Sequence, residues 1–240
     1  MATTKVTSSV RTLATDEIVT ANITDANVTT AKIADDAVTL AKMAPGTDGN
    51  LISYDASGNP AAVATGTLGN VLTSAGAGAP PTMSMPSTIT SDTSVGTGTT
   101  YNITGIPAGV RCVSILFEGV STNGTSPILV QLGDAGGIET SGYLAESTQS
   151  NGGSTTSSTA GFPMFQHLAA HSMAGIMDLR LKDVANFTWV SGHNARSATN
   201  VVLSGGGVKS LSAALTQLRI TTVNGSDVFD AGTVGLQYSY

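Results

Sequence analysis

Three consecutive ten-residue repeats near the N-terminus constrain the fold of this chain more than any other feature. They span residues 13–22, 23–32 and 33–42, and each has an aliphatic residue at positions one and six and alanine at position nine. A period of ten matches neither the α-helical turn nor a heptad, and the recurring threonine, valine, isoleucine and asparagine are poor helix formers. The array therefore predicts short β-strands joined at corners that carry aspartate, although its alanines and lysines leave a helical alternative open.

A second repeat, with a period of twenty residues, predicts two β-hairpins. The sequence Gly-Thr-Asp-Gly-Asn-Leu-Ile at 46–52 recurs as Gly-Thr-Leu-Gly-Asn-Val-Leu at 66–72. In each copy Gly-Asn leads into two aliphatic residues, and a later Gly-x-Pro sequence marks the turn of the hairpin. An isolated hairpin is only marginally stable in water, so the two hairpins cannot bury these aliphatic side chains by themselves.

The aliphatic residues of both repeats predict a homotrimer. Three identical chains around one axis could bury them in a shared core of intertwined β-structure, which would form a trimeric stalk. The residues expected in that core are Ile23, Val28, Ile33, Val38, Leu51, Ile52, Val71 and Leu72.

Pro80, Pro81 and Pro86 mark a change of organisation, after which the chain has the length of an ordinary domain. Segments of strand-like composition follow one another there, separated by turns rich in glycine, asparagine and serine, as in a β-sandwich or jelly-roll-like domain. The expected strands are 99–103, 110–117, 128–132, 142–145, 174–182, 188–191, 215–223 and 234–240.

We therefore expect an all-β chain in three parts: an N-terminal repeat segment at 1–45, a hairpin stalk at 46–86, and a C-terminal β-sandwich domain at 87–240. Within the last part, the Asn-Gly-Gly and Ser/Thr run at 147–160 predicts a long exposed loop. The run Gly205-Gly206-Gly207 predicts the corner of a hairpin.

The composition of the chain limits the kinds of partner that it can bind. The net charge of −6 argues against nucleic acid, because no basic stripe is present to neutralise phosphates. No apolar stretch approaches the ~20 residues of a membrane-spanning helix, and the N-terminus lacks the apolar core of a signal peptide. We expect a protein that is made in a cytoplasm and is not inserted into a membrane.

Side chains with catalytic or metal-binding chemistry are few. Cys112 is the single cysteine, which excludes an intrachain disulfide, and its apolar neighbours predict a buried core position. His167 and His171 could share a helical face and hold a metal, but the motif lacks the glutamate of a His-Glu-x-x-His hydrolase. We expect an ordinary pair, unless a trimer axis brings three copies together. Asp134, in Asp-Ala-Gly-Gly, is expected to cap a turn. No serine has the spacing of a nucleophile elbow, so neither an enzyme nor a cofactor is expected.

Recognition by exposed side chains is the more plausible chemistry. A lone tryptophan on a strand is more often a core residue, but at an exposed tip it could stack on a sugar ring while amide and guanidinium groups bond the hydroxyls. The candidate receptor contacts are Tyr143, Trp189, His193, Asn194 and Arg196, with core packing as the alternative for the aromatic residues.

Parts of the sequence resemble bacteriophage tail-fibre proteins. Ile-Thr-Asp-Ala-Asn-Val-Thr-Thr-Ala-Lys at 23–32 and Ile-Ala-Asp-Asp-Ala-Val-Thr-Leu-Ala-Lys at 33–42 resemble the decapeptide arrays of these fibres. The hairpin repeats look like the segment that commonly follows such arrays. The motifs Ile-Thr-Gly-Ile-Pro-Ala-Gly-Val at 103–110 and Arg-Ile-Thr-Thr-Val-Asn-Gly-Ser-Asp-Val-Phe-Asp-Ala-Gly at 219–232 are similar to a terminal domain of these fibres, as is the segment 130–143.

The resemblance implies a homotrimeric fibre of a virion that carries no catalytic residues. We expect a short tail fibre or spike that binds the host surface, for example a glycan, and attaches to other virion proteins through its N-terminal segment. Because residues 1–86 make only a short repetitive part, a capsid-surface head fibre or decoration protein is the alternative. A small polysaccharide-degrading spike is a second alternative.

Overall fold

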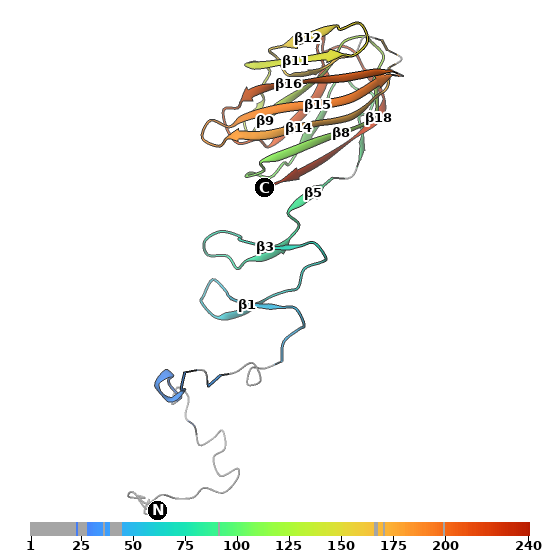
Figure 1. The fold of residues 1–240 in the computed structure, drawn as a ribbon. Coiled ribbons are helices and arrows are strands. Elements are labelled where there is room, and N and C mark those ends of the chain that lie inside the picture. The colour runs from blue at the N-terminus through green and yellow to red at the C-terminus, as the bar shows by residue number, and fades with distance from the viewer. Residues whose placement is uncertain are drawn as a thin grey trace, which may run out of the picture. The chain divides into compact units, whose positions relative to one another are not determined.

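The chain forms an all-β protein in a computed structural model, which describes residues 23, 28–35, 37–38, 45–90, 92–165, 168–169, 171–198 and 200–240. Its sheets are antiparallel, and Figure 1 shows their strands in chain order. The chain divides into two compact units, Met1–Thr65 and Gly66–Tyr240. The predicted all-β fold is confirmed.

In the described part of the first unit, β1 (Leu51–Tyr54) and β2 (Pro60–Val63) form a hairpin. Its turn is held by the Asp55 carboxylate, which accepts hydrogen bonds from the backbone N–H groups of Ser57 at 2.8 Å and Asn59 at 2.9 Å. Gly58 has a φ of +80°, which glycine adopts without strain. The first predicted hairpin is confirmed.

The decapeptide array does not form strands in its described part. Thr30–Lys32 instead forms a single 3-10 turn, η2, in which the N–H of Lys32 donates to the carbonyl of Thr29 at 2.8 Å. The prediction of β-structure is wrong for these residues, because the turn satisfies the N–H groups of Lys32 and Ile33 locally and none of the described strands pairs with them. The rest of the array lies outside the described residues.

The second unit begins with the other predicted hairpin, which is also confirmed. It consists of β3 (Val71–Thr73) and β4 (Thr82–Ser84), with Leu72 opposite Met83. The hydroxyl groups of Thr73 and Ser84 lie 2.6 Å apart across the two strands. The hairpin is short, so it depends on turn chemistry and such polar pairs.

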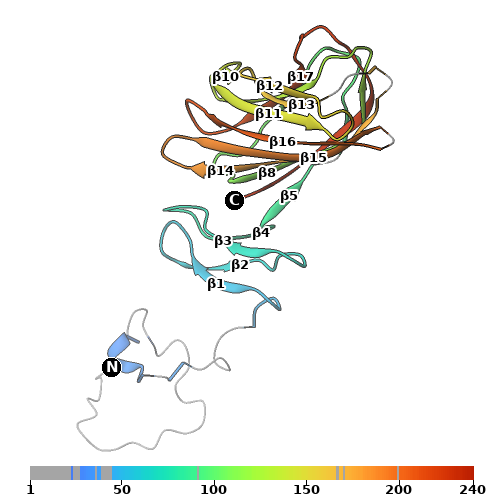
Figure 2. The same ribbon diagram turned by 45° about the horizontal axis from the view of Figure 1, so that its top comes forward.

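Two facing antiparallel sheets, which together we call the two-sheet domain, make up the rest of the second unit (Figure 2). Among the described residues, the large sheet has nine strands: β12 (Thr155–Ser158), β11 (Tyr143–Gln149), β16 (Val201–Ser210), β15 (Thr188–Ala198), β14 (Met173–Asp183), β8 (Cys112–Thr122), β18 (Phe229–Ser239) and β5 (Ser87–Ile89) in spatial order, with β6 (Thr93–Ser94) also on β18. The small sheet has five: β10 (Gly137–Ile138), β9 (Ile128–Asp134), β17 (Gln217–Thr222) and β7 (Tyr101–Thr104), with β13 (Phe162–Met164) on β9.

One hydrophobic core lies between the two sheets. In β8 the side chains of Val113, Ile115 and Phe117 are buried while the residues between them are partly exposed, as the alternation of a strand with one buried face requires. The central strand β9 is buried along its whole length. A strand is present at each of the eight predicted positions, but several bounds differ: β15, predicted at 188–191, extends to Ala198, and β18, predicted at 234–240, begins at Phe229.

Three local predictions are wrong. Residues 147–160 are not a long loop, because the end of β11 and the edge strand β12 form a hairpin there. The run Gly205–Gly207 lies inside β16, paired with both β11 and β15, and does not turn a corner. Cys112 is only half-buried, since it starts β8 on the outer side of the sheet, where its Sγ accepts a hydrogen bond from Arg180 Nη1 at 3.1 Å.

Candidate functional site

The five candidate receptor contacts separate into buried and exposed groups. Tyr143, Trp189 and His193 retain 0%, 1% and 3% of their surface, so they cannot touch a receptor and their prediction as contacts is wrong. Asn194 and Arg196 are exposed, because they alternate with His193 and its buried neighbours along β15. The outer face of the large sheet is therefore the part of this region that a ligand can reach.

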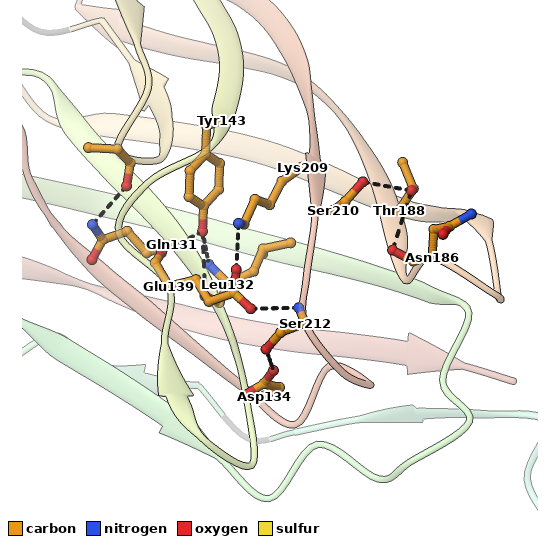
Figure 3. Close-up of polar contacts among 11 residues, drawn as sticks. Gln131, Leu132, Asp134, Glu139, Tyr143, Asn186, Thr188, Lys209, Ser210 and Ser212 are labelled. Carbon is orange, nitrogen blue, oxygen red and sulfur yellow. Dashed lines mark hydrogen bonds and ion pairs between the residues drawn. The ribbon is translucent and has the colours of Figure 1, made fainter.

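Tyr143 belongs to a buried polar network (Figure 3). Its hydroxyl accepts a hydrogen bond from the N–H of Leu132 at 2.7 Å and donates one to the carbonyl of Glu139 at 2.9 Å. Its ring packs edge-on against Phe162 and lies 5.2 Å from Lys209 Nζ. Burial raises the pKa of Tyr143. These contacts make Tyr143 a link between β9 and the segment that precedes β11.

The same network contains an ion pair between Lys209 and Glu139, whose side chains are 6% and 24% exposed. Glu139 Oε1 also accepts a hydrogen bond from the N–H of Ser212 at 2.7 Å, and Ser212 Oγ donates to Asp134 Oδ2 at 2.6 Å (Figure 3). Burial acts to raise the pKa of Glu139, but the hydrogen bonds from Lys209 and Ser212 outweigh it and the pKa is lowered. The network joins the connection between β9 and β11 to the connection between β16 and β17, which is a structural role.

Asp134 caps the turn that follows β9, as predicted. Its Oδ1 accepts a hydrogen bond from the N–H of Gly136 at 2.7 Å. The hydrogen bond from Ser212, followed by that from Gly136, lowers the pKa of this carboxyl group.

A serine–histidine pair that the sequence did not predict lies in the core. Ser147 Oγ is 2.9 Å from His193 Nε2, and it also accepts a hydrogen bond from the N–H of Phe165 at 3.2 Å. Burial lowers the pKa of His193 to about 4, so the imidazole is neutral at pH 7. A serine beside a histidine is the geometry of an activated nucleophile, but these two side chains are only 2% and 3% exposed. The pair is a polar contact of the core. The two-residue alternation along β11 and β15 was the sequence signal that could have placed both side chains on the buried face.

Of the other two histidines, the structure describes only His171. His171 is buried, and its Nδ1 lies 3.0 Å from Ser197 Oγ. His167 lies outside the described residues, so the prediction about the pair stays open. Within the described ranges, no group of three histidine, cysteine, aspartate or glutamate side chains is placed to hold a metal ion.

The aliphatic side chains of both repeats are exposed in the single chain. Leu51 and Ile52 are 43% and 65% exposed in the first hairpin, and Val71 and Leu72 are 48% and 52% exposed in the second. The described decapeptide positions have similar exposure: Ile23 46%, Val28 55%, Ile33 41% and Val38 59%. A hollow of about 660 Å³ in the second unit is lined by Val71, Leu72, Met85, Pro86 and Tyr240, among others.

Comparisons with family models, with curated proteins and with solved structures find no match to this chain. The part of the chain that the structure describes contains no helix that is long and apolar enough to cross a membrane. The features of the molecule that bear on its function are therefore the repeats, the exposed aliphatic side chains and the outer face of the large sheet.

Proposed function

We propose that this protein is a non-enzymatic structural component of a bacteriophage particle, a short homotrimeric tail fibre or spike that binds the surface of the host cell. In this proposal three chains intertwine through their repeats to form a stalk, and each carries a β-sandwich of jelly-roll-like kind. The observation that carries the proposal is the exposure of the aliphatic side chains in both hairpins. Two-stranded hairpins have no core of their own, so identical chains are the simplest source of the missing burial.

The gain from such an assembly is large enough to matter. Leu51, Ile52, Val71 and Leu72 are each about half exposed in the single chain, and complete burial would contribute about 1 kcal/mol for each side chain. A three-fold arrangement repeats this gain in every chain. The exposed Ile23, Val28, Ile33 and Val38 would add to it if the decapeptides join the same core.

The two parts of the chain suit different tasks in a virion. Residues 1–45 would attach the fibre to other virion proteins, and residues 87–240 would face the host. The two-sheet domain supports this assignment because its single core fixes the strands that carry exposed polar side chains such as Asn194 and Arg196. Rigid strands hold a contact surface in place at little entropic cost on binding.

Sedimentation analysis of the full-length protein at micromolar concentration tests the assembly. We expect a mass three times the 24.0 kDa of one chain. Replacing Ile52 and Leu72 together by serine should shift the equilibrium toward the monomer, whereas Val223→Ser is the matched control, because Val223 is 47% exposed but lies outside the hairpins. A monomer for the unmodified protein would contradict the proposal.

A head fibre or decoration protein of the capsid is the second candidate. It is favoured by the shortness of the repetitive part, in whose described residues four strands of three or four residues form two hairpins. Counting copies of the protein in purified virions distinguishes the two, because tail fibres are present in few copies and capsid fibres in many. Absence of the protein from the particles would contradict both.

A further inference from the structure

The outer face of the large sheet carries two adjoining hollows of about 600 and 580 Å³. Both are open to solvent, and they share Glu146 and Gly206, so they form one continuous depression, which we call the β11–β16 groove. Further lining residues are Leu144, Ser157 and Thr159 in the first hollow and Thr148, Thr155 and Ser204 in the second. The groove is lined mainly by hydroxyl groups, with one carboxylate at its centre.

The strand register shows what lies beside the groove. Glu146 is opposite Gly206, Gly206 is opposite Gly192, and Gly192 is opposite Asp178, so one row across the sheet has two glycines between two carboxylates. Neighbouring strands are about 4.8 Å apart, which gives a strip of bare backbone two strands wide. Rows on either side follow from the same register: Leu144, Val208 and Val190 form an apolar row, and Thr148, Ser204 and Asn194 form a polar one.

Local packing explains the glycines of β16. A Cβ atom on Gly205 would lie 2.5 Å from His193 Cε1, and one on Gly207 would lie 2.5 Å from the Cβ of Ala145. On Gly206 it would lie 2.6 Å from the carbonyl oxygen of Ser191. These three positions have no room for a side chain.

Gly192 is different. A Cβ atom there would meet nothing within 4 Å, and Gly192 is not among the residues with positive φ. Glycine inside a strand weakens the sheet, and it often marks a place where a ligand approaches the backbone closely. Packing within the chain therefore gives no reason for the glycine, whereas a ligand that lies on the strip would require it.

We propose that the β11–β16 groove and the adjacent Gly192 bind a neutral saccharide chain, with one sugar ring over the strip of Gly206 and Gly192. This inference rests on the proposed function in host attachment and assigns its binding site. Glu146 would accept hydrogen bonds from sugar hydroxyls, and the amide of Asn194 would donate and accept them. Leu144 and Val190 would contact the apolar C–H face of a ring.

The groove favours a neutral saccharide over other polymers. Over the glycine row itself a polyanion would meet the carboxylates of Glu146 and Asp178 and no cation, because the exposed Arg180 lies in the neighbouring row, opposite Val190. A peptide could not add as a strand over the glycine strip, since β16 already pairs on both sides with β11 and β15. Asp178 accepts a hydrogen bond from Ser114 Oγ on the side away from Gly192. It would therefore contribute negative charge at one end of the glycine row, whereas Glu146 would contact the saccharide.

The test is binding of the full-length protein to maltoheptaose, cellohexaose and chitohexaose, followed by saturation-transfer NMR and titration calorimetry. We expect binding of at least one of them, a loss of at least tenfold in Gly192→Leu and a weaker loss in Glu146→Gln. The leucine has space, so the melting temperature of Gly192→Leu should stay equal or rise. Thr104→Leu, an exposed position on the edge strand of the small sheet, is the matched control and should bind normally.

Failure of all three saccharides to bind would overturn the inference, and so would binding that survives in Gly192→Leu. If a lysine-rich peptide bound in the groove and none of the saccharides displaced it, the assignment to saccharides would be overturned. The outcome is separate from that of the proposed function: a trimer that is present in virions but does not bind these saccharides refutes only the groove. Release of new reducing ends during incubation would instead contradict the non-enzymatic role.

Discussion

The hairpins and the two-sheet domain use similar residues in opposite ways. Ile52 in β1 is 65% exposed, whereas Ile115 in β8 is 0% exposed, although both are isoleucines in antiparallel strands. The hairpins consist of single strand pairs whose turns are held by local polar contacts such as those of Asp55. The domain faces one sheet with another, so every inward side chain meets a second layer. The comparison shows that strand formation and burial are separate events, and that the hairpins achieve only the first within one chain.

The largest expected change in the free energy of unfolding comes from replacing one of these two isoleucines, and the other serves as its comparison. Ile115→Ala should lower the free energy of unfolding of the two-sheet domain by about 3–4 kcal/mol, because it leaves a cavity in a packed core. Ile52→Ala should change it by less than about 0.5 kcal/mol. Chemical denaturation followed through the fluorescence of Trp189, the single tryptophan, measures both. Equal losses of unfolding free energy in the two variants would show that the hairpin and the domain do not differ in how they bury isoleucine.

The ion pair tests whether the domain also depends on buried charge. Glu139→Ala should cost about 3 kcal/mol, because it leaves the Lys209 ammonium, whose side chain is 6% exposed, without its partner. Lys209→Met should cost less, since Glu139 is 24% exposed and keeps the hydrogen bond from Ser212. Denaturant midpoints of the two variants give the order, and a larger loss in Lys209→Met would contradict it.

His193 should make the stability of the domain depend on pH. Its pKa is about 4 in the folded chain and 6.5 when unfolded, so the unfolded chain binds the proton more readily. The stabilisation is complete above pH 6.5 and is lost as the pH falls toward 4, with a decrease of about 2 kcal/mol between pH 7 and pH 5.

Denaturation curves over this pH range measure the effect. His193→Leu should flatten the dependence between pH 5 and pH 7, even if it lowers the overall stability. A wild-type protein whose stability is unchanged across this range would show that His193 does not stay neutral in the fold.

The smallest expected effect concerns the first hairpin. Gly58→Ala should destabilise it by about 1 kcal/mol, because alanine is strained at the φ of +80° that the turn requires. Gly46→Ala is the matched control, since a Cβ atom there meets nothing within 4 Å and the residue is not among those with positive φ. Hydrogen exchange of the β1 and β2 amides should accelerate only in the first variant, with the two-sheet domain unaffected. Faster exchange in the domain would show that the hairpin supports it.

The sequence alone determined where many of the strands lie, although not where they end. Strand-like composition between turn residues located the eight predicted strands of the domain, and the twenty-residue repeat located both hairpins. These features are local, because turn residues and side-chain periodicity act within a few positions of one another. Exposure of the hairpin aliphatics also followed from the sequence, since two short strands offer nothing to cover them.

Only the tertiary structure decided which residues share a site. Tyr143 and Trp189 fitted both an exposed tip and a core, and the second sheet placed them inside. Ser147 meets His193, and Gly205 leaves room for the imidazole, because β16 lies between β15, which precedes it directly in the chain, and β11, which is distant in sequence. A glycine run has the same composition at a corner and inside a strand. A glycine run inside a strand is required where the neighbouring strands leave no room for a side chain, and that depends on how the strands pack against one another.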